Sequence, residues 1–242
     1  MAEQIFKNVK LFLGGYDISG FSNDVAINET FEVKDRTTFG CNTRKRKIGL
    51  WDVTASFKGF TGYAQTADES HDAMKAVKGA EVPLTVCPAL DGAVGEKAFF
   101  FNAAYPTYNR AGAAGEIQTF DGEAQNVGDG LCEGTVLANS HFEASGNGAA
   151  KNLGAVTATQ KVYAVLHVLE IDAPTTVTVE IESDNAEGMA DPTSRIAFTA
   201  KTARGFQYGV PVSGAITDNW WRAKVTVTGA GHATVVVAIA IQ

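Results

Sequence analysis

The sequence predicts a mainly β fold with one short helix, and three observations lead to this prediction. Short runs of alternating apolar and polar residues recur along the chain, glycine is abundant at 25 of 242 residues, and a single stretch has helical periodicity. Alternation with period two is typical of strands that bury one face, and glycine-rich segments are typical of the turns between them. Apolar residues make up 45% of the chain, so a packed core is expected.

The first half of the chain contains the clearest strand patterns. Between Trp51 and Lys58 apolar and polar residues alternate without interruption, and residues 23–34 alternate with one slip near Glu29. Both segments are therefore predicted to be half-buried strands. With the other alternating or apolar runs, the predicted strands of this half span residues 4–13, 23–34, 51–58, 82–86, 96–105, 113–120 and 130–142.

One helix is predicted near residues 66–78. An N-cap and acidic first turn open it at residues 66–69, Gly79 ends it, and its apolar stripe consists of Ala73, Met74 and Val77. A helix of so few turns is expected to lie against a sheet and flank it.

The second half has a different texture and predicts a separate domain. The small, polar and glycine-rich segment 144–153 is predicted to be a linker between an N-terminal β domain (1–143) and a C-terminal domain (154–242). Evenly spaced strands with turn signals favour an antiparallel β-sandwich or jelly roll for the latter. Its predicted strands span residues 161–171, 175–183, 195–201, 205–210, 220–228 and 233–241.

A long polar segment from Asp35 to Lys47 separates two of the N-terminal strands. Most hairpin loops have about two to five residues, and longer ones are frequently functional. This segment ends in four adjacent cations, whose mutual repulsion calls for an acidic partner. A nucleic-acid patch and a contact with a neighbouring subunit are both consistent with the run, and the acidic chain favours the subunit contact. The candidate contact residues are Asp35, Arg36, Arg44, Lys45, Arg46 and Lys47.

Charge and cysteine usage exclude several classes of protein. The net charge is −7 and the pI is near 5.1, unlike a basic nucleic-acid-binding protein. Three widely spaced cysteines (Cys41, Cys87, Cys132) without a signal peptide predict reduced thiols in a protein made in a cytoplasm. The longest apolar run, near the C-terminus, is too short for a membrane-spanning helix, so no membrane association is expected.

No motif predicts an enzyme, a cofactor or a metal site. The sequence contains no HExxH, nucleophile elbow, P-loop or dinucleotide fingerprint in the required context. The four histidines show no ligand spacing, and His167 lies in an apolar strand, where a hydrogen-bonded residue of the sandwich is expected. We therefore predict no catalytic residue and no metal ligand. The histidines are His71, His141, His167 and His232.

Two further patterns leave alternatives open. The acidic segment from Glu180 to Glu187 could bind Ca²⁺, or could form an exposed strand face, which its alternation favours. Pairing of Glu180 with Glu182 as a hydrolase site is disfavoured because no second titrating partner accompanies them. The adjacent Trp220 and Trp221 are both candidate ligand contacts, although packing is the favoured role for both. They point to opposite faces of a strand, so one is expected in the core and the other at the surface.

Several of these segments resemble the tail tube proteins of tailed bacteriophages. The resemblance rests on DRTTFG at Asp35–Gly40, the following basic loop, GLWDVTASFKGF at Gly49–Phe60 and the short helix, and it covers residues 5–142. The second half is similar, more loosely, to β-sandwich modules appended to phage tail proteins.

The resemblance implies a structural virion protein of the tail, made in the bacterial host cytoplasm. It implies a tail-tube-type β-sandwich or barrel with one flanking helix and a long loop that reaches a neighbouring subunit. Copies would form hexameric rings that stack into a tube, with double-stranded DNA passing through an acidic lumen without specific binding. The other implied partners are the tail terminator, tape measure and distal tail proteins. An appended outer domain favours a non-contractile tail, and a carbohydrate- or cell-surface-binding tail module is the alternative.

Overall fold

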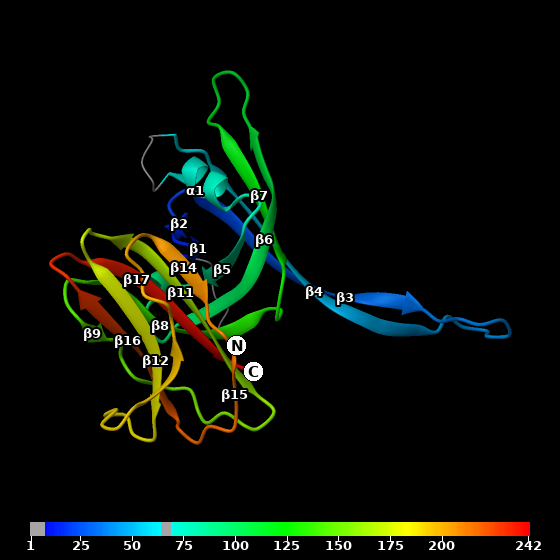
Figure 1. Cartoon of the computed structure of the whole chain (residues 1–242). Coiled ribbons are helices and arrows are strands. Elements are labelled where there is room, and N and C mark those ends of the chain that lie inside the picture. Colours follow the sequence, from blue (N-terminus) through cyan, green and yellow to red (C-terminus); the bar gives the residue numbers. More distant parts are fainter. Residues whose placement is uncertain (1–7, 64–68) are drawn as a thin grey trace.

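The computed structural model describes residues 8–63 and 69–242, and within them the molecule is mainly β with one α-helix (Figure 1). The predicted fold class is confirmed. The elements of the first half are β1 (Lys10–Leu13), β2 (Tyr16–Asp17), β3 (Ser22–Asp35), β4 (Arg46–Phe60), α1 (Ser70–Val77), β5 (Glu81–Cys87), the 3-10 turn η1 (Leu90–Gly92), β6 (Lys97–Ala111), β7 (Thr119–Asn126) and β8 (Cys132–Phe142).

The second half contains nine more strands. All six predicted strands of this half are found, although β13 ends earlier than expected. The strands are β9 (Gly146–Asn147), β10 (Lys151–Asn152), β11 (Lys161–Ile171), β12 (Thr176–Asp184), β13 (Thr193–Ala197), β14 (Gly205–Tyr208), β15 (Val212–Ser213), β16 (Trp220–Thr228) and β17 (Ala233–Ile241).

One antiparallel sheet of twelve strands runs through both halves. Its main path is β14-β11-β17-β8-β6-β5-β1-β2, while β7 connects β6 to β4 and β3. The sheet curls, so that β14 lies against β5 and β11 lies against β2. The curled interior is lined with apolar side chains from both halves, including Phe12, Phe100 and Val236.

A second sheet completes the predicted C-terminal sandwich. Its five strands follow the order β10-β16-β12-β13, with β9 also pairing with β16. This sheet packs against the β8, β11 and β17 part of the large sheet through a core that includes Leu166, Val179, Trp221 and Val237. The alternation in β12 and β16 thus places one face of each strand in the sandwich interior, as the sequence predicts.

The segment 144–153, which composition predicts to be a linker, is hydrogen-bonded into the five-stranded sheet. It contains β9 and β10, which pair with β16 through Asn147↔Lys224 and Lys151↔Trp221. The strand β8 from the first predicted domain pairs with β17 from the second. The domain boundary therefore stays a prediction, while the backbone of both halves is joined in one sheet.

Two predicted strands of the first half begin about six residues later than expected, while β4 and β6 are longer than predicted. The strand predicted at 113–120 begins only at Thr119, because a turn precedes it: Glu116 N–H donates to the Ala113 carbonyl and Gly115 has φ +87°. The strand predicted at 4–13 starts at Lys10 as β1, and residues 1–7 lie outside the described part of the chain.

The predicted apolar stripe of the helix is confirmed by its burial. Ala73, Met74 and Val77 of α1 pack in the N-terminal core, and Gly79 follows the helix with φ +77°. The Ser70 hydroxyl anchors the first turn, because it donates to the Phe60 carbonyl and accepts from Gly62 N–H, both at 3.0 Å. Of the residues predicted to form the N-cap and acidic first turn, 66–68 lie outside the described residues. The prediction is wrong for Glu69, because α1 begins only at Ser70 and Glu69 precedes it as an N-cap without a side-chain capping bond.

His167 is fully buried inside the curled sheet and joins its two sides. Its Nδ1–H donates to the Gly14 carbonyl oxygen, and its Nε2 accepts from the Thr85 hydroxyl at 2.7 Å. The ring is thus neutral, buried and hydrogen-bonded, as predicted, but it faces the first half of the chain and not the interior of the sandwich. Burial lowers the pKa of His167 from 6.5 to about 4, because the charged ring would lose its hydration.

The buried His167 makes folding stability depend on pH. Below about pH 6.5 the unfolded chain binds a proton that the folded chain does not, so unfolding is favoured as the pH falls to about 4. The expected loss over this interval is about 3 kcal/mol. Urea unfolding at pH 7 and pH 4.5 measures it. The His167→Gln variant, which keeps a donor and an acceptor, should lose most of the slope, and an unchanged slope would contradict the assignment.

Candidate functional site

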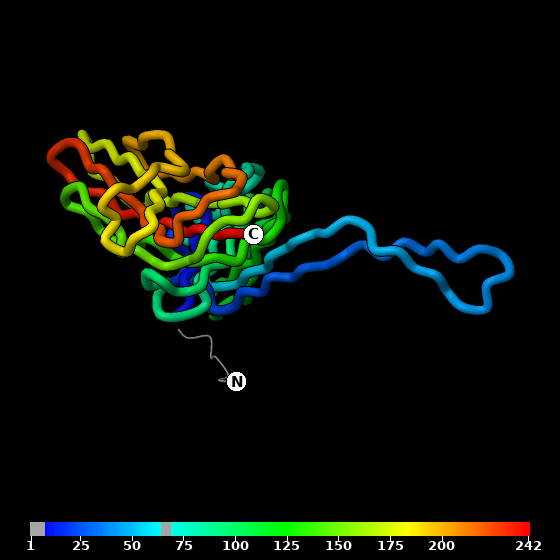
Figure 2. Tube along the Cα trace, turned by 90° about the horizontal axis from the view of Figure 1, so that it is seen from below, coloured from blue at the N-terminus to red at the C-terminus, as the bar shows by residue number. Residues whose placement is uncertain are grey.

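The strands β3 and β4 extend far beyond the body as a two-stranded arm, which we define as residues 28–52 (Figures 1 and 2). Every arm residue is exposed except Cys41, which is half-buried. At the foot, β4 pairs with β7 from Thr54 to Phe60, whereas beyond Val53 it pairs with β3 alone. Within the described residues, β3 pairs only with β4, so both edges of the arm are open.

The predicted loop from Asp35 to Lys47 is partly strand. The register continues through Val33↔Ile48 and Lys34↔Lys47 to Asp35↔Arg46, which leaves residues 36–45 as the loop. Beyond the last pair, Arg36 N–H donates to the Lys45 carbonyl at 2.8 Å. Local side chains also close the tip, because the Asp35 carboxylate accepts from Thr37 N–H at 2.8 Å. The Thr37 hydroxyl is the main reason that the pKa of Asp35 is lowered.

The six candidate contact residues all lie at the end of the arm. Arg36, Arg44 and Lys45 belong to the loop, while Asp35, Arg46 and Lys47 end the two strands. Lys34 and Lys47 lie directly opposite each other, a like-charge pairing that is unfavourable in an isolated hairpin. Among the described residues, none of the four cations Arg44–Lys47 forms an ion pair.

The charge of the molecule is strongly divided between the arm end and the rest. Residues 33–48 contain six cations and one acid, a net charge of +5. Because the whole chain carries −7, the remaining residues carry −12. A second copy of this chain therefore offers the acidic surface that the arm end lacks.

An exposed apolar stripe runs along one face of the arm. The sequence did not predict this stripe. Phe31 lies opposite Trp51 with the rings stacked 6.2 Å apart, and Val33 lies opposite Ile48 on the same face. Ile48 is 66% exposed, and Leu50 beside it is 80% exposed. The prediction of a half-buried strand over 23–34 is wrong from residue 28 onward. There β3 and β4 extend past the body, and both faces of the two strands are exposed. No local sequence signal marks this change, and only the structure shows that the two strands reach the unusual lengths of 14 and 15 residues.

The foot of the arm is fixed by close packing. The Trp51 ring lies against the backbone of Gly130, where an added Cβ would lie 2.3 Å from Trp51 Cζ3. Gly130 also has φ +85°, so a larger residue is disfavoured on both grounds. Trp51 therefore sets the direction in which the arm leaves the body.

The two tryptophans predicted as possible ligand contacts have different environments. Trp221 is 0% exposed in the sandwich core, and its Nε1–H donates to the Gly154 carbonyl at 3.1 Å. A fully buried ring cannot contact a ligand, so the candidate role for Trp221 is wrong. Trp220 is half-buried and stays a candidate.

The acidic residues of β12 are engaged with cations of the neighbouring strand. Arg222 donates to Glu182 through Nε and Nη2 at 2.9 and 2.8 Å, and Lys224 lies 3.3 Å from Glu182 and 3.6 Å from Glu180. Neighbouring Asp218 accepts from Arg195 at 2.8 Å. These partners compensate the carboxylate charge. The prediction of an exposed strand face is wrong for Glu182, which is only 4% exposed, while Glu180 beside it is half-buried; the ion pairs with the neighbouring strand cover both carboxylates.

The three cysteines lie in two kinds of environment. Cys87 and Cys132 are buried thiols whose pKa values burial raises to about 12 and about 11, whereas Cys41 lies on the arm.

A membrane-spanning helix must be both long and apolar, and residues 8–63 and 69–242 contain no helix that meets both conditions.

Comparisons with known proteins give little further guidance. No protein-family model matches the chain, and a search of curated proteins finds no match. Among solved structures, the chain is similar to the crystal structure of the phage SPP1 Dit protein (gp 19.1), described as a paradigm of the hub adsorption apparatus in phages that infect Gram-positive bacteria. The TM-score is 0.35 and the identity 10%, over 98% of this chain and 100% of that chain. A likeness of this size carries no argument about function.

Proposed function

We propose that this chain is a structural subunit of a phage tail, that it assembles with copies of itself, and that the arm makes the contact between copies. The single observation that carries the proposal is the arm, whose residues 28–52 are almost entirely exposed and project from the body. An isolated two-stranded hairpin is marginally stable in water. An arm of this length is therefore expected to be covered in the working state of the protein.

The chemistry of the arm favours a second copy as the partner. Its apolar stripe resembles the core of an interface, whose burial contributes affinity, and its basic end complements a body of opposite charge. Its open strand edges offer backbone hydrogen bonds that closure into a ring would satisfy. All three features are on one element, and together they support self-assembly over binding of a small ligand.

The finer form of the proposal is a tail tube protein without enzymatic activity. In it, copies form hexameric rings that stack into a tube, and double-stranded DNA passes through the lumen without specific binding. The tail terminator, tape measure and distal tail proteins would contact the ends or interior of the tube. The C-terminal sandwich would lie outside, which favours a non-contractile tail. The resemblance of residues 5–142 to tail tube proteins supports this form.

Electron microscopy of the purified chain tests the proposal and its charge component together. Wild-type protein is expected to form rings or tubes of uniform bore. The variant with Arg44, Lys45, Arg46 and Lys47 replaced by Ser should fold normally, since all four side chains are exposed, but should remain monomeric at the same concentration. High salt should also weaken assembly of the wild-type protein, because it screens the attraction between the basic arm end and an acidic body.

A matched variant separates the arm from net charge. Replacing the exposed body residues Lys58, Lys75, Lys97 and Lys161 by Ser removes the same charge away from the arm. This variant should still assemble. Strictly monomeric wild-type protein at high concentration would refute self-assembly, and normal tubes from the arm variant would remove the basic run from the contact.

A further inference from the structure

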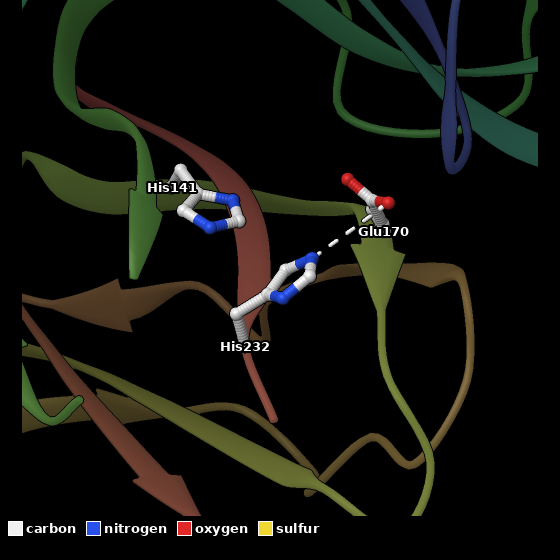
Figure 3. A group of neighbouring side chains, drawn as sticks. All are labelled: His141, Glu170 and His232. Atoms are coloured by element: carbon white, nitrogen blue, oxygen red, sulfur yellow. Dashed lines mark ion pairs between the residues drawn. The ribbon is translucent and has the colours of Figure 1, made fainter. Parts of the chain in front are cut away.

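A group of metal-ligating side chains lies in the C-terminal half, apart from the arm. His141, Glu170 and His232 point toward one another, and their nearest ligand atoms all lie within 4.8 Å of one another (Figure 3). His141 and Glu170 are exposed and His232 is half-buried, so the group is open to solvent. The β16–β17 turn that precedes His232 lies at the end of the body away from the arm (Figures 1 and 2).

Strand register, and not sequence spacing, creates this group. Thr234 of β17 lies opposite His141 of β8 on one side and opposite Glu170 of β11 on the other. His232 precedes Thr234 by two residues and projects toward the same group. A bulge between Val168 and Glu170 shifts the register of β11 and places Glu170 in this row. Bulges of this kind commonly re-aim side chains at functional sites.

The hydrogen bonds around the group prepare both histidines to bind a cation. Asp172 Oδ2 lies 2.8 Å from His232 Nδ1, so the Nδ1–H donates to the carboxylate and Nε2 keeps its lone pair. His232 Nε2 faces Glu170 Oε1 at 3.7 Å. His141 Nδ1 lies 3.1 Å from the Thr234 hydroxyl, which can orient this second ring. A carboxylate behind a ligating histidine is the usual arrangement at zinc sites.

We propose that His141, Glu170 and His232 bind one Zn²⁺ ion, with Asp172 as the residue that orients His232. Two imidazoles and one carboxylate match the preference of Zn²⁺ for nitrogen and oxygen ligands. Tetrahedral coordination requires donor atoms about 3.3 Å apart. The His232–Glu170 pair is close to this separation at 3.7 Å, and rotation of the exposed His141 and Glu170 side chains brings in the third donor. Three protein ligands leave a fourth position for water or a ligand.

The bound ion would join the ends of three adjacent strands. His141, Glu170 and His232 belong to β8, β11 and the residue before β17, so one ion would connect neighbours across the sheet. Without an ion, His232 only contacts the carboxylates of Glu170 and Asp172 at the protein surface. Such surface pairs contribute little to the free energy of unfolding. Zn²⁺ binding and stability should therefore rise together.

Calorimetric titration of ZnCl₂ into the tag-free, EDTA-treated full chain tests the site. We expect one Zn²⁺ per chain and a rise in Tm when Zn²⁺ exceeds its Kd. Asp172→Asn should weaken binding about 10–100-fold, and His232→Ala should weaken it more than that. Asp172 is exposed and His232 is half-buried outside the hydrophobic cores, so both variants should fold like the parent chain.

His71→Ala is the matched control. His71 lies on α1, where its Nδ1 is 2.9 Å from the Tyr108 hydroxyl, outside the three-strand group. This variant should bind Zn²⁺ like the parent chain. Absence of stoichiometric binding by the parent chain, or equal weakening by His71→Ala and His232→Ala, would overturn the proposal. Because the three proposed ligands belong to the C-terminal half and the last residues of β8, apart from the arm, the outcome of the titration does not depend on self-assembly.

Discussion

Replacing residues 32–50 by Asn-Gly, which joins Phe31 to Trp51 by a short turn, abolishes self-assembly and leaves the body folded. The deleted part contains the basic end and the exposed Val33, Phe39, Ile48 and Leu50. Burial of four such side chains contributes about 6 kcal/mol at the lower end of the usual range, which corresponds to roughly a 10⁴-fold change in affinity. Sedimentation velocity over a concentration series, with electron microscopy of the same samples, measures the loss.

The body should tolerate this deletion. The stacked Phe31 and Trp51 rings and the packing of Trp51 on Gly130 are retained, and the free energy of unfolding should stay within about 1 kcal/mol of the parent value. Assembly by the shortened chain at the parent concentration would show that the contact lies elsewhere.

A matched pair of double variants isolates the apolar stripe. Val33→Ser with Ile48→Ser removes two exposed β-branched side chains from the arm, while Ile117→Ser with Val210→Ser removes two that are 71% and 79% exposed elsewhere. Only the arm variant should reduce assembly. Equal effects from both would indicate general surface hydrophobicity and not a specific contact.

Trp221→Ala is expected to cause a large loss of stability through a single substitution. The ring is fully buried in the sandwich core, and its removal leaves a cavity and the Gly154 carbonyl without its indole donor. Losses of about 3–5 kcal/mol are usual for buried tryptophan. Thermal unfolding should show a Tm lowered by roughly 10 °C.

The preceding tryptophan provides the control for this substitution. Trp220→Ala changes a half-buried ring on the other face of β16 and should cost much less. If the C-terminal sandwich binds carbohydrate, the parent chain should bind to a glycan array. A folded Trp220→Ala variant should then lose this binding. Equal destabilisation by both variants would contradict the assignment of Trp221 to the core.

Local patterns were enough to predict much of the fold. The apolar stripe of α1, the six C-terminal strands and the hydrogen-bonded core position of His167 follow from periodicity, because burial of one face is written into residue order. The unusual character of the segment after Asp35 was likewise visible, since a cation run between strands has no local explanation.

Features that depend on distant strands could not be predicted in this way. Phe31 and Val33 have the alternation of a half-buried strand, and nothing local shows that β7 pairs with β4 only as far as Thr54 and that β3 and β4 continue beyond it alone. The pairing of β8 with β17 is equally non-local, and it brings His141 next to His232. Register between strands so far apart is set by the whole core, and a single sequence does not display it.

The continuity of the large sheet has a mechanical consequence. Because β8 is hydrogen-bonded to both β6 and β17, relative motion of the two halves would break a row of backbone hydrogen bonds at once. The subunit should therefore respond to torque as one stiff body, with the slender arm as its compliant part. In an assembly of the proposed kind, bending would therefore occur at the arms that join the subunits, while the body of each subunit keeps its shape.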